Sequence, residues 1–323
     1  MKLIMTAYNR KIFYVLINLI LTNFIAFHIN ANVVVSIKPI GFIASAITDN
    51  IIPVDTIVPD GASEHDYILR PSDEKKIKNT DLLIWSGSTI ESFMYKSVQQ
   101  IPSNKVLVIT EIPEVRKSLI KIEENNHTNN EKNTFEQDLQ SPLNSKKYNM
   151  HFWTSPNIAK IIAIEIYKKL SNIMPQYKNK FNENLKQFEK SLNDIDKQIM
   201  TELKPLKNKQ YFVFHDAYVY FEKHYGLSSL GCFTINPEIQ PGIKHLYKIR
   251  KQIREKKVIC VFSEPQFRPA IIDNVTKGIK INKGILDPLG SNIKLSKDSY
   301  LKFLLQLSSQ YQTCLQEKHR NKN

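Results

Sequence analysis

The sequence predicts an α/β protein in which two α/β halves are separated by one long helix. Three observations support this class. Short apolar runs alternate with helical patterns from Asn32, a long helical pattern lies between Pro175 and Pro205, and the alternation then resumes. Strands that alternate with amphipathic helices are typical of a parallel sheet with crossover helices. The 323 residues also correspond to about two ordinary domains.

Residues 1–31 are predicted to be a secretory signal peptide. Basic residues up to Lys11 precede the apolar stretch 12–27, and Ala31 follows as a small residue at which cleavage can occur. The apolar stretch is shorter than the about 20 residues of a membrane span, although an uncleaved membrane anchor is the alternative. Because no cysteine precedes Cys232, the lipid-attachment cysteine of a lipoprotein is absent, and we expect a free periplasmic protein.

Residues 32–174 are predicted to form an N-terminal lobe. Residues 117–148 within it are rich in Asn, Lys, Glu and Ser and poor in apolar residues, which predicts a mobile surface loop. His127 in this loop is either a solvated residue or an additional metal contact. Apolar runs predict strands at 33–37, 54–58, 82–85 and 106–110. Helical periods predict a helix at 40–48, a short helix that Ser72 caps, and a helix that Ser155 caps and that runs to Met174.

Residues 175–205 are predicted to form a linker helix about 40 Å long. Apolar residues recur at every third or fourth position of this segment and form a single stripe. A coiled-coil arm for dimerisation is the alternative. The prolines at both ends and the single apolar stripe favour a helix that packs against both lobes.

Residues 206–323 are predicted to form a C-terminal lobe. All three cysteines of the chain, Cys232, Cys260 and Cys314, lie in this part. An oxidising compartment permits one disulfide among them, and the spacing alone leaves all three pairings open. The predicted strands are 211–214, 258–262 and one within 279–286, and the predicted helices are 217–225 between a cap at Asp216 and a stop at Gly226, 242–256, and 299–317.

Composition and motif content exclude several classes of function. Lys and Arg total 45 against 31 Asp and Glu, a net charge of +14, yet the basic residues are scattered and no nucleic-acid-binding motif accompanies them. We therefore expect a basic solvated surface and no nucleic-acid partner. With nine glycines, and without a phosphate-binding glycine loop, HExxH, nucleophile elbow or CxxC motif, the chain is not predicted to bind a nucleotide or to carry a common catalytic motif.

Three histidines occupy positions where strands end or helices begin. His65 lies in the loop after the second strand, His151 directly precedes a helix cap, and His215 ends a strand. Such edges hold ligands in open α/β sheets. Neutral imidazole is a common zinc ligand, and three imidazoles with a carboxylate or a water complete a tetrahedron. Spacing alone leaves open whether these histidines bind a metal, whereas His224 is predicted to cap a helix and His245 to lie on a helix surface.

Longer motifs resemble the ZnuA family, the periplasmic zinc-binding proteins of high-affinity zinc ABC importers. The resemblance follows the chain order over nearly the whole predicted mature sequence. It rests on VSIKPIGF (35–42), VPDGASEHDY (58–67), LRPSD (69–73), NMHFW (149–153), FVFHDAY (212–218), FTINPEIQPG (233–242), FSEPQFRP (262–269) and LDPLG (286–290).

The resemblance implies a cluster A-I type solute-binding protein, with two Rossmann-like lobes of parallel sheets that are joined by a long rigid linker helix and hold a metal between them. His65, His151 and His215 match the zinc-ligand positions of the family. Glu64 matches the carboxylate of close relatives, and Asp287 matches the aspartate that completes the site in more distant members, including manganese-binding ones. A histidine at position 215 points to zinc, because manganese-type relatives tend to have a carboxylate there.

The resemblance also implies a disulfide and argues against a second zinc site. Cys260 and Cys314 match the disulfide pair of the Gram-negative form. The mobile loop of the family is often crowded with His and Asp, whereas here it contains the single His127. Cys232 occupies a position that is His in some relatives. These two departures argue against an auxiliary zinc site or zinc scavenging by the loop.

The function implied by the resemblance is periplasmic high-affinity capture of Zn²⁺ and its delivery to an inner-membrane zinc ABC importer. The partners would be the permease and its ATPase, and the protein would be a monomer and not an enzyme. A zinc hydrolase with Glu64 as general base is one alternative, because three histidines and an open position also describe catalytic zinc. An adhesin that carries a metal is another.

Overall fold

The computed structural model describes residues 31–49, 51–122, 148–237 and 239–316. Residues 1–30 of the predicted signal peptide and residues 123–147 of the predicted loop, with His127, lie outside this part. The residues from Asn32 onward form one compact unit. Within the described residues, no helix has the length and apolar character needed to span a membrane.

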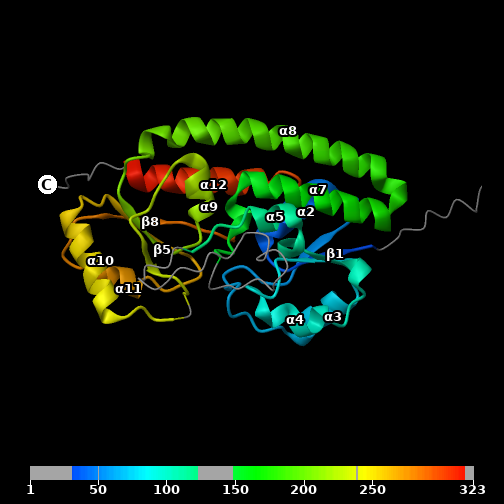
Figure 1. The fold of residues 1–323 in the computed structure, drawn as a ribbon, viewed down its shortest axis with the longest axis horizontal. Coiled ribbons are helices and arrows are strands. Elements are labelled where there is room, and N and C mark those ends of the chain that lie inside the picture. Colours follow the sequence, from blue (N-terminus) through cyan, green and yellow to red (C-terminus); the bar gives the residue numbers. More distant parts are fainter. Residues whose placement is uncertain (1–30, 50, 123–147, 238, 317–323) are drawn as a thin grey trace, which may run out of the picture. The chain divides into compact units, whose positions relative to one another are not determined.

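The N-terminal half contains a parallel sheet of four strands in the order β2-β1-β3-β4 (Figure 1). In its register, Val33 pairs with both Val54 and Leu82, so β1 lies in the centre of the sheet. The buried valines of β1 accordingly lie among apolar side chains on both faces, as expected for a central parallel strand. The strands are β1 (Val33–Val35), β2 (Val54–Thr56), β3 (Leu82–Trp85) and β4 (Val106–Val108).

The C-terminal half contains a second parallel sheet of four strands in the order β6-β5-β7-β8. The central strand β5 is buried along its whole length. Among the described residues, one free-standing antiparallel β-bridge joins Lys121 and Tyr148 of the N-terminal half. The strands of the second sheet are β5 (Tyr211–His215), β6 (Cys232–Thr234), β7 (Cys260–Ser263) and β8 (Asn282–Ile285).

One layer of helices covers both sheets on the same side. The longest, α8 (Lys178–Leu203), runs above α7 (Pro156–Ile173), α2 (Lys38–Thr48) and α12 (Ser299–Gln316) and contacts all three (Figure 1). The buried side chain of Asn184 in α8 donates a hydrogen bond of 2.9 Å to the carbonyl of Ile47 at the end of α2. The predicted α/β architecture with a long helix between its halves is therefore confirmed.

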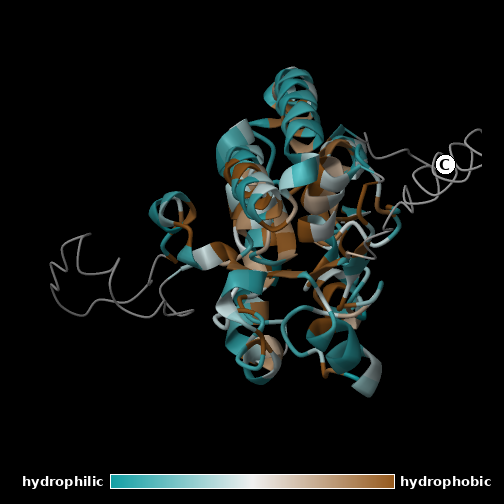
Figure 2. Cartoon of the chain, turned by 90° about the vertical axis from the view of Figure 1, so that its right-hand side faces the viewer, coloured by the Kyte–Doolittle hydropathy of each residue, from teal (hydrophilic) through white to brown (hydrophobic). Residues whose placement is uncertain are grey.

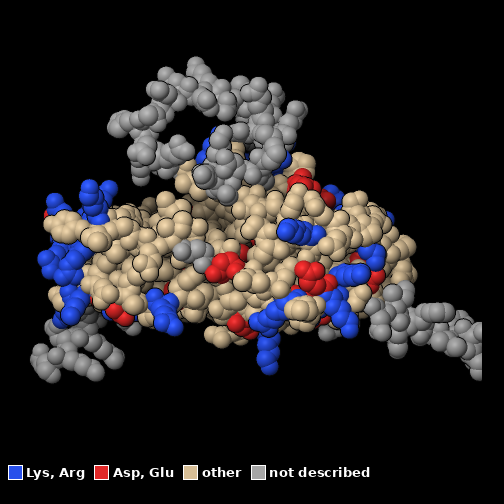
Figure 3. Space-filling model, turned by 90° about the horizontal axis from the view of Figure 1, so that it is seen from below, with Lys and Arg blue, Asp and Glu red and all other residues tan. Residues whose placement is uncertain are grey.

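The remaining helices are short or lie on the other faces of the sheets. Hydrophobic residues gather between the helices and strands, and the outward faces of the helices are hydrophilic (Figure 2). On the face drawn in Figure 3, Lys and Arg form several separate groups with Asp and Glu among them. The remaining α-helices are α3 (Pro71–Lys78), α4 (Tyr95–Val98), α5 (Pro113–Lys117), α9 (Val219–Tyr225), α10 (Ile243–Glu255) and α11 (Ala270–Thr276).

The last helix, α12, connects the two halves. Its first turns pack on α2, where the rings of Phe42 and Phe303 lie 5.9 Å apart. Its last turn carries Cys314, which forms the disulfide with Cys260 of β7 that the resemblance implies. The helix therefore runs from the core of the N-terminal half to the core of the C-terminal half.

Two predicted helix caps are wrong. The helix α3 begins at Pro71, ahead of Ser72, because proline suits the first helical position and the carboxylate of Asp73 accepts a hydrogen bond from the N–H of Arg70. The helix α9 begins at Val219 instead of Ala217, and Asp216 does not cap it. The carboxylate of Asp216 accepts a hydrogen bond from the side chain of Asn149 instead.

Candidate metal centre

The three histidines predicted from the sequence meet between the two sheets. His65 follows β2 in the loop that turns at Gly61 (φ 81°), and His215 is the last residue of β5. His151 directly precedes a short 3₁₀ helix and the capped start of α7, where the hydroxyl of Ser155 accepts a hydrogen bond from the N–H of Ile158. The carboxyl ends of β2 and β5 thus bring together residues that are 150 positions apart in the chain.

Four side chains bring their donor atoms close enough to hold one ion: Glu64, His65, His151 and His215. The Nε2 atom of His151 lies 3.3 Å from that of His65 and 3.1 Å from that of His215. The Oε1 atom of Glu64 lies 3.7 Å from Nε2 of His65 and 3.6 Å from Nε2 of His151. A tetrahedron with metal–nitrogen bonds of about 2.0–2.1 Å has edges of about 3.3 Å, so these distances fit a tetrahedral ion.

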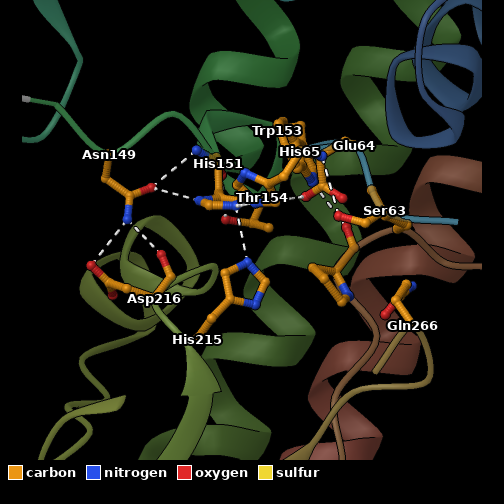
Figure 4. Close-up of polar contacts among 12 residues, drawn as sticks. Ser63, Glu64, His65, Asn149, His151, Trp153, Thr154, His215, Asp216 and Gln266 are labelled. Atoms are coloured by element: carbon orange, nitrogen blue, oxygen red, sulfur yellow. Dashed lines mark hydrogen bonds and ion pairs between the residues drawn. The ribbon is translucent and has the colours of Figure 1, made fainter. Parts of the chain in front are cut away.

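Hydrogen bonds orient two of the imidazoles with Nε2 toward the centre, and Figure 4 draws the contact between Asn149 and His151. The Nδ1 atom of His151 lies 3.1 Å from Oδ1 of Asn149. The Nδ1 atom of His215 lies 2.7 Å from the carboxylate of Glu264, which is itself buried. Because these oxygens accept hydrogen bonds, each Nδ1 carries a proton and each neutral ring directs the lone pair of Nε2 at the centre.

Burial determines the charge state of the ligand group. It raises the pKa of Glu64 to about 7, against a smaller lowering by His215, and it lowers the pKa of His65 to about 3, helped by the charge of His215. Burial and the same charge hold the pKa of His151 well below 6.5. For His215, burial is the largest single effect and lowers the pKa, but the charge and hydrogen bond of Glu264, together with the charges of Glu64 and Asp216, raise the pKa overall. His65 and His151 are therefore neutral at pH 7, the form that a metal requires.

One oxygen of Glu64 has no hydrogen-bond partner within the described residues. This atom, Oε1, is fully buried and faces the imidazoles of His65 and His151. A buried carboxylate oxygen without a partner is costly. A cation among the four donors would remove this cost, so the donor set fits a metal ion.

Aromatic rings border the group on two sides. The ring of Trp153 lies 5.2 Å from that of His151, and the ring of Phe267 lies 6.1 Å from that of His215. The indole N–H of Trp153 donates a hydrogen bond of 2.9 Å to the carbonyl of Pro288 in the C-terminal half. Side chains from both halves thus border the group, in which Glu64, His151 and His215 are buried and His65 is partly exposed.

Asp287, the further ligand implied by the resemblance, is not among the four grouped donors. Its buried carboxylate accepts hydrogen bonds from Nε2 of Gln266 at 2.9 Å and from the backbone N–H groups of Leu289 at 3.1 Å and Ser291 at 2.6 Å. These contacts stabilise the turn that follows β8 and engage the oxygens of Asp287 there.

The two histidines that were assigned structural roles lie outside the group. His224 lies in the last turn of α9, and its Nε2 contacts the carboxylate of Asp196 in α8 at 2.7 Å. His245 is exposed on α10, as predicted, and its Nε2 lies 3.1 Å from the carbonyl of Cys232.

Sequence reasoning missed the two residues that orient the histidines. Asn149 and Glu264 both lie within the family motifs, at NMHFW and FSEPQF, but neither is predicted from residue spacing. Their role depends on the tertiary fold, which places each of them beside the Nδ1 atom of a histidine.

Two parallel sheets under one long helix, with three imidazoles and a carboxylate gathered between them, define a metal-binding solute-binding protein. The family described as "Zinc-uptake complex component A periplasmic" (ZnuA) matches residues 33–314. The chain belongs to this family, and the resemblance seen in the sequence is confirmed.

Relatives and solved structures agree with this assignment. The chain is 49% identical over 291 residues to the high-affinity zinc uptake system protein ZnuA of Yersinia pestis, covering 88% of this chain and 92% of that protein. It is 40% identical over 290 residues to the protein of the same name from Haemophilus ducreyi, covering 88% and 94%. The fold is shared with a crystal structure of ZnuA, at a TM-score of 0.72 and 20% identity, covering 88% of this chain and 99% of that chain. It is also shared with the periplasmic zinc-binding protein TroA of Treponema pallidum, at a TM-score of 0.72 and 15% identity, with the same coverage of the two chains.

Proposed function

We propose that this protein captures a single Zn²⁺ ion in the periplasm with Glu64, His65, His151 and His215 and delivers it to a zinc ABC importer of the inner membrane. The observation that carries this proposal is the set of distances of 3.1–3.7 Å that link these four side chains. The receiving partners are the permease and its ATPase, and relatives named as high-affinity zinc uptake proteins support this assignment.

The donor set favours zinc over harder cations. Imidazole nitrogen suits zinc, whereas manganese and magnesium prefer sites with more oxygen ligands and octahedral geometry. Three imidazoles and one carboxylate are the ligands of this group. A tetrahedral zinc ion satisfies all four ligands and leaves no coordination position for a reacting water, so capture without catalysis is the function that fits these residues.

The domain organisation that accompanies this function is a signal peptide at 1–31, an N-terminal metal-binding lobe at 32–174, a linker helix at 175–205 and a C-terminal lobe at 206–323. His65 and His151 come from the first lobe and His215 from the second, so the bound ion connects the two. The linker helix limits bending because α8 packs on helices of both lobes. Metal binding then orders the ligand loops without a wide closure of the lobes, and the protein acts as a monomer.

Native mass spectrometry of protein that has been stripped by a chelator and then refilled tests this function. We expect one tightly held zinc ion, and no retention of manganese offered in equal amount. Two or more tightly held zinc ions would show a second site, and preferential retention of manganese would refute the proposed selectivity. Turnover of ester or peptide substrates by the zinc-loaded protein would instead support a hydrolase. Mass measurement of the exported protein also tests the signal peptide, because the mature chain should begin at Asn32.

A further inference from the structure

The side chain of Asn149 connects the two halves of the candidate metal centre. Its Oδ1 atom accepts a hydrogen bond from the backbone N–H of His151 at 3.0 Å and lies 3.1 Å from Nδ1 of the same residue. Its Nδ2 group donates to the backbone carbonyl and to the carboxylate of Asp216, at 2.5 and 3.1 Å. Asp216 directly follows His215, so the buried amide lies between two of the proposed ligands (Figure 4).

The orientation of this amide is determined by its partners. Two oxygens of Asp216 face the NH₂ group, and the backbone N–H of His151 faces the amide oxygen. The reverse orientation would place oxygen against oxygen and nitrogen against a donor. Since the oxygen faces Nδ1 of His151, that nitrogen must carry the proton, and Nε2 of His151 is left with a free lone pair.

The backbone of Asn149 is held as firmly as its side chain. Its carbonyl accepts a hydrogen bond of 2.6 Å from the hydroxyl of Tyr220 in α9, and its N–H donates to the carbonyl of Ile120 at 2.9 Å. The same tyrosine hydroxyl accepts a hydrogen bond from the N–H of Ile120. Residues of both lobes therefore fix the amide plane against which the His151 ring is placed.

We infer that Asn149 is a positioning residue for the metal, which selects the Nδ1–H tautomer of His151 and anchors this ligand to the opposite lobe at Asp216. This role deepens the proposed function, on which it rests. Outer partners of metal-ligating histidines fix ring orientation and tautomer, and their loss typically costs about 10–100-fold in metal affinity. A neutral amide achieves this here without adding a negative charge to the buried site.

Two measurements on the full chain test the inference. The first is nuclear magnetic resonance of the histidine ring nitrogens in the metal-free protein, which reports the tautomer. The second is zinc affinity from competition with a chelator. We expect the Nδ1–H tautomer at His151 in the unmodified protein, and in Asn149→Ala a mixture of tautomers with zinc affinity lowered by about 10–100-fold. Asn184→Ala is the matched control, because it removes another buried asparagine, in α8, that donates to the carbonyl of Ile47.

A second set of variants separates the two contacts of the amide. Asn149→Asp keeps an oxygen that accepts from His151 but places an oxygen against Asp216, so we expect the tautomer to be retained while zinc affinity falls. The exchange Asn149→Asp with Asp216→Asn supplies the donor from the opposite side and should recover part of that affinity. These near-isosteric variants keep the test valid even if Asn149→Ala does not fold.

Three results would overturn the inference: an Nε2–H tautomer of His151 in the unmodified protein, no greater loss of zinc affinity in Asn149→Ala than in Asn184→Ala, or no recovery in the exchanged pair. Failure of the proposed function gives a different result. The unmodified protein would then hold no zinc, while the tautomer measurement in the metal-free protein would still report the contact between Asn149 and His151.

Discussion

The Nε2 atoms of His151 and His215 lie 3.1 Å apart, although His151 precedes α7 in the N-terminal half and His215 ends β5 of the second sheet. Each ring has its Nδ1–H bonded to an oxygen behind it, so two neutral rings would direct their lone pairs at each other. A cation between the rings removes this repulsion: a metal ion when the site is loaded, or a proton on His215, whose pKa is raised, when the site is empty. The arrangement is therefore favourable for a metal ion and unfavourable for an empty pair of neutral imidazoles.

Replacing His215 should lower zinc affinity far more than replacing other histidines. His215→Ala removes the donor atom that β5 brings to the group, so we expect a loss beyond the about 10–100-fold typical of outer partners. His224→Ala and His245→Ala are matched controls, because these side chains contact Asp196 and the carbonyl of Cys232 instead of the group. Competition with a zinc chelator measures all three. Equal losses would refute the ligand assignment.

Glu264→Gln should weaken zinc binding without removing a ligand. The buried carboxylate of Glu264 accepts the Nδ1–H of His215 at 2.7 Å, which makes Nε2 a better donor to a metal. The glutamine side chain has nearly the shape of the glutamate but no negative charge, so we expect zinc affinity to fall by about 10–100-fold. Glu255→Gln at the exposed end of α10 is the control in the same competition assay. An unchanged affinity in Glu264→Gln would show that the carboxylate does not tune the histidine.

The buried carboxyl group of Glu222 should make the metal-free protein less stable as pH rises from about 4.5 to about 7. Burial raises its pKa to about 7, and the hydroxyls of Tyr211 and Tyr311 donate to its Oε1 at 2.9 and 3.1 Å. The folded state thus keeps a proton on Glu222 that the unfolded state releases, so the contribution of Glu222 to stability is fully present below pH 4.5 and is lost as pH rises to about 7. The effect on the free energy of unfolding is on the order of 3 kcal/mol.

Urea unfolding of the metal-free protein at pH 5 and pH 8 measures this effect. Glu222→Gln retains an acceptor for both tyrosines but cannot titrate, so it should unfold with a smaller difference between the two pH values than the unmodified protein. Glu255→Gln controls for removal of a surface carboxylate. An identical pH difference in the unmodified protein and in Glu222→Gln would mean that Glu222 does not titrate on unfolding.

Removing the disulfide should destabilise the protein by about 4 kcal/mol in the chain-entropy model. Cys260 and Cys314 are separated by 54 positions, and both are buried. Urea unfolding should show the loss for Cys260→Ala with Cys314→Ala under oxidising conditions, and the difference should shrink when a reductant opens the disulfide of the unmodified protein. Cys232→Ala should retain the dependence on reductant. If reduction leaves the unmodified protein equally stable, the disulfide contributes no stability.

The elements that follow strong hydrophobic periodicity were predictable from the sequence. The apolar runs of β1, β3 and β5 and the apolar stripe of α8 lie where the pattern predicts them. Short elements with weak patterns were not predicted: β6 has three residues, and α11 has seven. Periodicity needs several turns or alternations before it rises above the background of ordinary composition.

The candidate ligands were predictable for a different reason. His65, His151 and His215 each lie at the end of a strand or the start of a helix, and the edge of a parallel sheet is where such residues meet. The partners behind them depend on tertiary contacts. Asp216 has the local pattern of a helix cap, but the approach of Asn149 from 67 positions away gives its carboxylate another partner. A helix-capping pattern in the sequence does not reveal a hydrogen-bond partner that only the tertiary fold brings close.

The contact between α2 and α12 makes the core of the N-terminal half depend on the last helix. Phe42 and Phe303 complete one core from opposite ends of the described sequence, and Leu295 lies against Gly41. Contacts of such high sequence separation form slowly, because the loop between them must first close. A nascent N-terminal half therefore lacks part of its own core until almost the whole polypeptide is available. Truncating the chain before α12 should therefore expose apolar side chains of α2, such as Phe42, that the intact protein buries.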